Sequence, residues 1–220
     1  MKDIFSYNTD INKTAYMNWR TSHHDHLHNM HVIAKGFADS SLVLVKQILE
    51  NNNKGKEADS LIFPILFNAN HAIEVYLKLL IWTLNTLLAN GKTYENSHNL
   101  KTLLKEVKRL EKEFENKLDY EHFFGKLTKY INELYKKIEI QNKEGKSFSD
   151  ITFARYSLTR EKEPQFYINE FDNVVVDLTN FIVVFNEIFK NLDDLSMHYQ
   201  HLIEMRNEME SEMRMDSYYE

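Results

Sequence analysis

Residues that break helices are rare in this chain, and their rarity limits the folds it can adopt. Only five glycines and two prolines occur among 220 residues. Tight turns use glycine and proline heavily, so an all-β sandwich or barrel with many turns is disfavoured. Hydrophobic residues make up 43% of the chain, which is ample for a packed core. We therefore predict an all-α fold, an elongated bundle of about five helices with a short inserted loop or β-hairpin.

The distribution of apolar and polar residues divides the chain into three parts. Residues 1–24 carry no helical pattern and are predicted to be an irregular segment. Residues 25–195 form the helical domain, within which residues 145–172 interrupt the helical spacing as the inserted loop or hairpin. Residues 196–220 are predicted to be a C-terminal helix extension.

Capping residues indicate where the long helices begin and end. The first helix is predicted to start at about Asp25. The second is predicted to start at Asp59 and Ser60 and to run to Asn90 and Gly91, a length of about 45 Å. The other predicted caps are Asn96 or Ser97 for the third helix, and Asp172 and Asn173 for the last.

Residue types and segments that are absent from the chain limit the cellular compartment we predict and the kinds of site it can form. There is no cysteine, so disulfides and thiolate metal sites are excluded. The N-terminal sequence is polar and lacks the apolar core of a signal peptide. No run of about 18 apolar residues is present, so we expect no membrane span. These features predict a soluble, cytoplasmic protein that needs no cofactor.

The net charge of −6 is unevenly distributed. Residues 101–146 hold twelve Lys or Arg against nine acids, whereas residues 161–220 hold four against fourteen. Phosphate neutralisation supplies most of the affinity of nonspecific nucleic-acid binding, so the acidic overall field disfavours it. Any contact with RNA must therefore use a local basic surface.

An otherwise apolar helix carries a strip of ionisable residues. At about 100° per residue, His71, Glu74 and Lys78 fall on one side of it, and Asn85 joins them. One interpretation is that the strip faces water or forms an internal salt bridge. The other is a functional groove, in which apolar walls shift the pKa values of groups that act in acid–base chemistry. His98, beside the start of the next helix, is predicted to bond nearby backbone or a partner helix.

These residues carry a resemblance to a known family. The segment NANHAIEVYLKLLI (68–81), followed by SHNLKTLL (97–104), is similar to the all-α HEPN superfamily. One branch of that superfamily has an H-x-x-E-x-x-x-K pattern, matched by His71, Glu74 and Lys78. A Ser-His pair then opens the next helix, matched by Ser97 and His98. A further segment, ARYSLTREKEPQF, resembles the RYP segment of that branch, with serine replacing the proline.

The resemblance implies an action on RNA, in the setting of bacterial stress or phage defence. Catalytic HEPN proteins are metal-independent ribonucleases, and two protomers bring together an Arg-x4–6-His motif on a late helix. In such a motif histidine can move the 2′-hydroxyl proton, and arginine can stabilise charge on the phosphate.

The candidate catalytic residues depart from that motif. Arg206 and Asn207 begin it on the last helix, but no histidine follows at the required spacing. Arg20 and His26 fit the spacing at the opposite end of the chain. Enzymatic activity therefore stays open, and the alternative is a noncatalytic helical binding or oligomerisation module.

The interrupted segment contains a candidate anion site. Arg155 and Arg160 flank the aromatic Tyr156 in an otherwise acidic third of the chain. Arginine can bind phosphate or carboxylate in a forked geometry, and tyrosine can stack on a base. Either this loop anchors itself to the bundle through a helix carboxylate such as Glu74, or it forms an anion site where it crosses the His71 strip.

Two further segments suggest ligands or partners. His24, His28 and His31 are spaced so that they could present imidazoles to zinc or copper, but a frayed polar helix start explains them better, and we predict no metal site. In the tail, apolar side chains share one face, which favours docking onto the bundle or onto a partner. We expect a homodimer or a helical protein partner, and RNA as a further partner. The tail residues on this face are His198, Leu202, Met205, Met209 and Met213.

Overall fold

The computed structural model describes residues 2–17, 20–115, 117–141, 147–149, 154–158, 162 and 174–216. These residues form a bundle of five α-helices, which confirms the predicted fold class. The helices are α1 (His26–Glu50), α2 (Ala58–Leu87), α3 (Leu100–Phe114), α4 (Tyr120–Ile138) and α6 (Leu178–Asp216). A short 3₁₀ turn, η1 (Ile11–Lys13), lies in the N-terminal segment.

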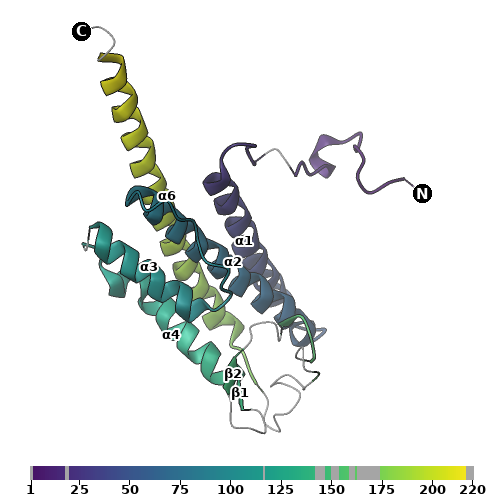
Figure 1. Cartoon of the computed structure of the whole chain (residues 1–220). Coiled ribbons are helices and arrows are strands. Elements are labelled where there is room, and N and C mark those ends of the chain that lie inside the picture. Colours follow the sequence, from purple (N-terminus) through teal and green to yellow (C-terminus); the bar gives the residue numbers. More distant parts are fainter. Residues whose placement is uncertain are drawn as a thin grey trace.

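Helix α2 is the centre of the bundle. It packs against α1, α3 and α6, and α4 packs against α6 (Figure 1). Helices α3 and α4 are neighbours in the chain but contact each other at few positions. The C-terminal half of α6 continues beyond the other helices, and the N-terminal segment extends away from the bundle.

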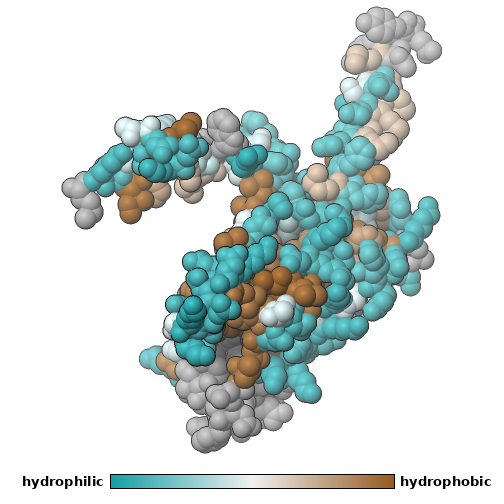
Figure 2. Space-filling view, turned by 180° about the vertical axis from the view of Figure 1, so that it is seen from behind, coloured by the Kyte–Doolittle hydropathy of each residue, from teal (hydrophilic) through white to brown (hydrophobic). Residues whose placement is uncertain are grey.

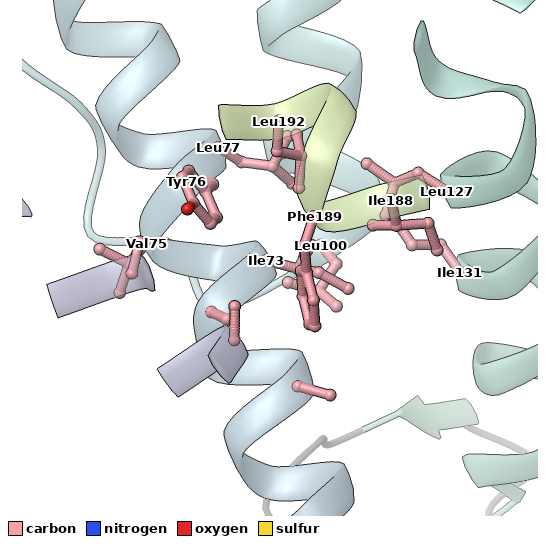
Figure 3. Close-up of a cluster of buried hydrophobic side chains, with 14 of the residues drawn as sticks. Ile73, Val75, Tyr76, Leu77, Leu100, Leu127, Ile131, Ile188, Phe189 and Leu192 are labelled. Carbon is pink, nitrogen blue, oxygen red and sulfur yellow. The ribbon is translucent and has the colours of Figure 1, made fainter. Parts of the chain in front are cut away.

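The core is formed by apolar side chains that all five helices direct inward. Side chains from α2, α3, α4 and α6 meet in one cluster, which includes Ile73, Leu100, Ile131 and Phe189 (Figure 3). On α3 five apolar residues that recur at helical spacing are buried: Leu100, Leu103, Leu104, Val107 and Leu110. On α1 the buried residues are Ala34, Ala38, Ser41, Leu42, Val45 and Ile48.

The helix starts agree with prediction at α1 and differ at the other predicted caps. The carboxylate of Asp25 accepts a hydrogen bond from the backbone of His28 and caps α1. Helix α2 begins at Ala58, before the predicted caps, and has no side-chain cap. Asn99 caps α3, two or three residues after the predicted positions. Asp177 accepts from the first backbone amides of α6, whereas the predicted caps Asp172 and Asn173 lie outside the described residues.

The inserted segment begins with a short hairpin. Strand β1 (Glu139–Gln141) follows α4 directly and pairs antiparallel with β2 (Ser147–Ser149), with Ile140 opposite Phe148. The hairpin thus starts before residue 145, and most of the predicted insertion lies outside the described residues. Helix α6 runs unbroken past residue 196, so no change of structure marks the predicted start of the C-terminal extension. Among the helices described, none has the length and apolar character needed to span a membrane.

Candidate functional site

The predicted polar strip converges on the carboxylate of Glu74. Lys78 donates to Glu74 Oε1 over 2.7 Å, and Nδ1 of His98 lies 2.9 Å from the same oxygen. Nδ1 of His71 lies 4.0 Å from the other oxygen, Oε2. The helical spacing of α2 aligns three of these residues, and the start of α3 brings the fourth to them. The structure therefore joins all four predicted residues in one network.

The centre of this network is inside the protein. Glu74 is only 5% exposed and Lys78 8% exposed, so each charge needs the other as a partner. The ammonium of Lys78 also lies 5.5 Å from the ring centre of Tyr94. The imidazole of His98, by contrast, is 75% exposed. The arrangement is an internal ion pair that fixes the segment before α3 onto α2, with one exposed histidine at its edge.

His71 sits at the opposite edge among aromatic rings. Its ring stacks on Phe67, with centroids 5.6 Å apart, and meets Phe37 edge-on at 4.5 Å. Burial lowers the pKa of His71 below its ordinary value; the nearby charges of Lys78 and Arg155 act in the same direction, and Glu74 opposes them. Burial therefore favours the neutral form of His71, which suits packing against aromatic rings.

The predicted anion-binding loop reaches the same face of α2. The guanidinium of Arg155 lies 5.3 Å from the ring centre of Phe67 and 5.4 Å from that of Tyr156. Arg155 thus contacts the bundle through an aromatic ring; among the described residues the carboxylate of Glu74 binds Lys78 and His98 and does not pair with Arg155. Arg160 lies outside the described residues.

The candidate catalytic pairs are engaged in other contacts. Arg206 donates to the carbonyl oxygens of Thr86 and Leu87, at 3.0 and 3.3 Å, and so caps the carboxyl end of α2. Its neighbour Asn207 is exposed. His26 stacks on Trp82, and the carbonyl of Arg20 bonds the ring of His28 at 2.8 Å. No interaction joins Arg20 to His26 in the part of the chain that the structure describes.

Replacing Arg206 with alanine is expected to lower the free energy of unfolding by about 1.5–3 kcal/mol, as expected for hydrogen bonds from a charged donor. The loss arises because the last carbonyls of α2 and the negative end of its dipole lose their cationic cap. Urea denaturation measures it. Asn207→Ala is the matched control and should change stability little. Equal effects of the two substitutions would contradict the capping role.

One partly buried network was not predicted from the sequence. Asp193 on α6 accepts hydrogen bonds from Nε2 of His31 at 2.6 Å and from the hydroxyl of Tyr76 at 2.9 Å. It joins α1, α2 and α6 at one point. The sequence signal was the acidic Asp193 next to the apolar stripe of α6, but nothing in the sequence indicated its two partners.

The histidines of the histidine-rich segment make separate contacts and do not converge on one site. The rings of His23 and His24 stack on each other, while His28 and His31 bond different partners on different elements. No group of three or more potential metal ligands occurs among the described residues.

A groove between α3 and α4 was also missed, and we call it the lysine groove. It has a volume of about 300 Å³, and no acidic side chain is among the described residues that line it. It exists because α3 and α4 contact each other at few positions. A larger pocket of about 450 Å³ beside Tyr94 differs in charge, because Glu95 and Glu106 line it. The lining of the lysine groove is Lys101, Leu104, Lys105, Lys108, Thr128, Ile131 and Asn132.

The lysines of the groove are positioned by their neighbours. Lys101 lies 5.0 Å above the ring of Tyr135, and Lys108 lies 5.6 Å above the ring of Phe124. Lys108 also donates to the hydroxyl of Thr128 at 3.1 Å. Burial lowers the pKa of Lys108, although the charge of Glu121 opposes that change. The sequence signal was the spacing of lysines at positions 101, 105 and 108, within the basic region 101–146.

A comparison of the chain with protein-family models, curated proteins and solved structures finds no significant match.

Proposed function

We propose that this protein is a HEPN-like helical module that binds or senses RNA, and that it contacts the RNA backbone through the lysine groove. The observation that carries the proposal is the concentration of positive charge in one place. Three lysines line a single groove, none of the described residues lining it is a carboxylate, and the net charge of the protein is −6. A local basic surface is what an acidic protein needs to bind a polyanion.

The chemistry of the groove suits phosphate oxygens. Each lysine ammonium is a compact charge with three donors. Asn132 and the hydroxyl of Thr128 add neutral donors on the opposite wall of the groove. The lysines lie along one face of α3, about one helical turn apart, so they can follow a phosphate backbone. The resemblance to HEPN proteins supports RNA as the polyanion.

The geometry favours binding over cleavage. Arg206 holds the carbonyls of α2, and its pattern lacks the histidine that would move a proton. Glu74 is occupied by a buried lysine and by His98. The proposed function therefore combines the RNA expectation with a noncatalytic role.

Fluorescence anisotropy with a labelled single-stranded RNA tests this proposal. Each phosphate contact contributes a slope of roughly −0.7 to a plot of log K against log salt, so three lysines predict a slope of about −2 between about 50 and 200 mM salt. Replacing Lys101, Lys105 and Lys108 together with glutamine should remove this salt-dependent binding.

The matched control changes the same charge elsewhere. Lys46, Lys54 and Lys56 lie on α1 and the turn after it, outside the groove, and their joint replacement with glutamine should leave binding near the parent value. The proposal fails if the parent shows no salt-dependent RNA binding. It also fails if the two triple variants weaken binding equally.

A further inference from the structure

Most of the end of α6 has no neighbour among the described residues of its own bundle. We call residues 204–216 the α6 tail. The last side chain of α6 that packs against the core is Leu202, and Arg206 contacts the end of α2. Beyond them the helix projects alone (Figure 1). Met205, Met209 and Met213 are 43%, 54% and 64% exposed, and paler apolar residues follow one side of the projecting helix in Figure 2.

This apolar stripe is accompanied by acidic residues. Glu204, Glu208 and Glu212 follow one another at every fourth position, beside the methionines. The tail holds five acids, and its two arginines, Arg206 and Arg214, both pair with Glu210. Two such tails packed together would bring like charges into contact, which opposes a simple pairing of tails. A partner surface must therefore be basic and must offer some apolar area.

The lysine groove has these properties. Successive lysines of the groove are four and then three residues apart along α3. This is close to the four-residue spacing of the three glutamates along the tail. Leu104 and Ile131 also line it and supply apolar surface. An amphipathic helix that lays its apolar side into such a groove, with charges at the rim, is a common mode of recognition.

The tail cannot reach the groove of its own chain. Helix α6 is continuous over its 39 residues, and its tail points away from the bundle to which α3 and α4 belong. A second copy can offer its groove. If each copy offers its tail to the other, the contact is reciprocal and closes into a two-fold dimer.

We propose that the α6 tail of one copy docks into the lysine groove of a second copy. The tail then occupies the surface that binds RNA, so that dimerisation and RNA binding compete; this competition rests on the proposed function. Free RNA and the acidic tail present the same kind of charge to the same lysines. The tail is thus a built-in competitor supplied by the partner copy.

Light scattering of the full chain without RNA tests the docking. We expect a dimer at about 0.1 M salt that dissociates at about 1 M salt, where charges are screened. Reversing Glu204, Glu208 and Glu212 to lysine should give monomers, and reversing Lys101, Lys105 and Lys108 to glutamate should also give monomers. Circular dichroism checks that both variants remain helical.

Mixing the two reversed variants is the decisive measurement. Each tail then meets a groove of opposite charge, so a heterodimer should form from two monomeric proteins. A parent that is monomeric at both salt concentrations overturns the docking. So does a dimer that survives both reversals, or a mixture that stays monomeric.

A separate measurement tests the competition. Removal of residues 207–220 keeps the cap formed by Arg206 and should give a monomer that binds RNA more tightly than the parent dimer. If the two reversed variants form a heterodimer but neither the parent nor the truncated protein binds RNA, the proposed function fails while the docking stands. If RNA binds with equal affinity before and after the truncation of a dimeric parent, the competition is overturned.

Discussion

Replacing Glu74 with alanine is expected to lower the free energy of unfolding by about 3–5 kcal/mol, the range found when one partner of a buried ion pair is removed. Lys78 would remain inside the protein without its carboxylate, because its side chain is only 10% exposed. His98 would lose the hydrogen bond that holds the segment before α3 against α2. The loss should be visible as a lower midpoint in urea denaturation with an unchanged slope.

Two further variants separate the contribution of the ion pair to stability from the contributions of neighbouring residues. His98→Ala should cost much less than Glu74→Ala, since that imidazole is 75% exposed. The double variant Glu74→Leu with Lys78→Met should recover most of the stability, because apolar residues of similar volume replace a buried pair at little cost. A double variant as unstable as Glu74→Ala would show that the uncompensated lysine is not the cause.

Alkaline pH is expected to lower the stability of the fold, in part through three tyrosines whose phenols stay protonated in the folded state, each contributing about 1 kcal/mol by about pH 11. Burial raises the pKa of Tyr76, Tyr130 and Tyr199, and the charges of Asp193 and Glu111 reinforce this at Tyr76 and Tyr199 respectively.

The direction of this pH effect on stability follows from the number of protons that each state binds. Above about pH 10 the unfolded chain releases these three protons while the folded chain keeps them, so stability falls as the pH rises. Below that pH both states hold the protons and the contribution is fully present.

Absorbance of tyrosinate near 295 nm, recorded beside circular dichroism, follows both events. Part of the tyrosinate signal should appear only as the helices unfold. In Tyr76→Phe the loss of stability between neutral pH and pH 11 should be smaller by about 1 kcal/mol, because the proton of Tyr76 is gone. Release of all the tyrosine protons before any loss of helix would contradict this account.

Local periodicity predicted much of the fold and part of the site. The strip of His71, Glu74 and Lys78 was predictable because residues three and four apart share a helix face whatever the tertiary structure. The buried apolar residues of α3 share one face for the same reason. His98 was assigned to the predicted site because of the family resemblance. Its contact with Glu74 depends on the path of the chain between α2 and α3.

Contacts between distant segments were not predictable in this way. Asp193 contacts His31 and Tyr76 only when α1, α2 and α6 have a particular rotation about their axes and a particular position along them. The residue pattern of a single helix specifies neither. The lysine groove likewise depends on how loosely α3 lies against α4. The start of α6 was predicted early because acidic and amide residues near position 172 resemble the true cap, Asp177, in chemistry.

The continuity of α6 couples the orientation of its tail to the register of the bundle. No break separates the buried half from the projecting half, so α6 behaves as one rod of about 58 Å. Each residue inserted between Leu202 and the tail would turn the methionine stripe by about 100° and advance it by about 1.5 Å. The direction in which the methionine stripe faces is therefore encoded in residue count as well as in residue type, and a length change in this helix would redirect the stripe while leaving each of its side chains unaltered.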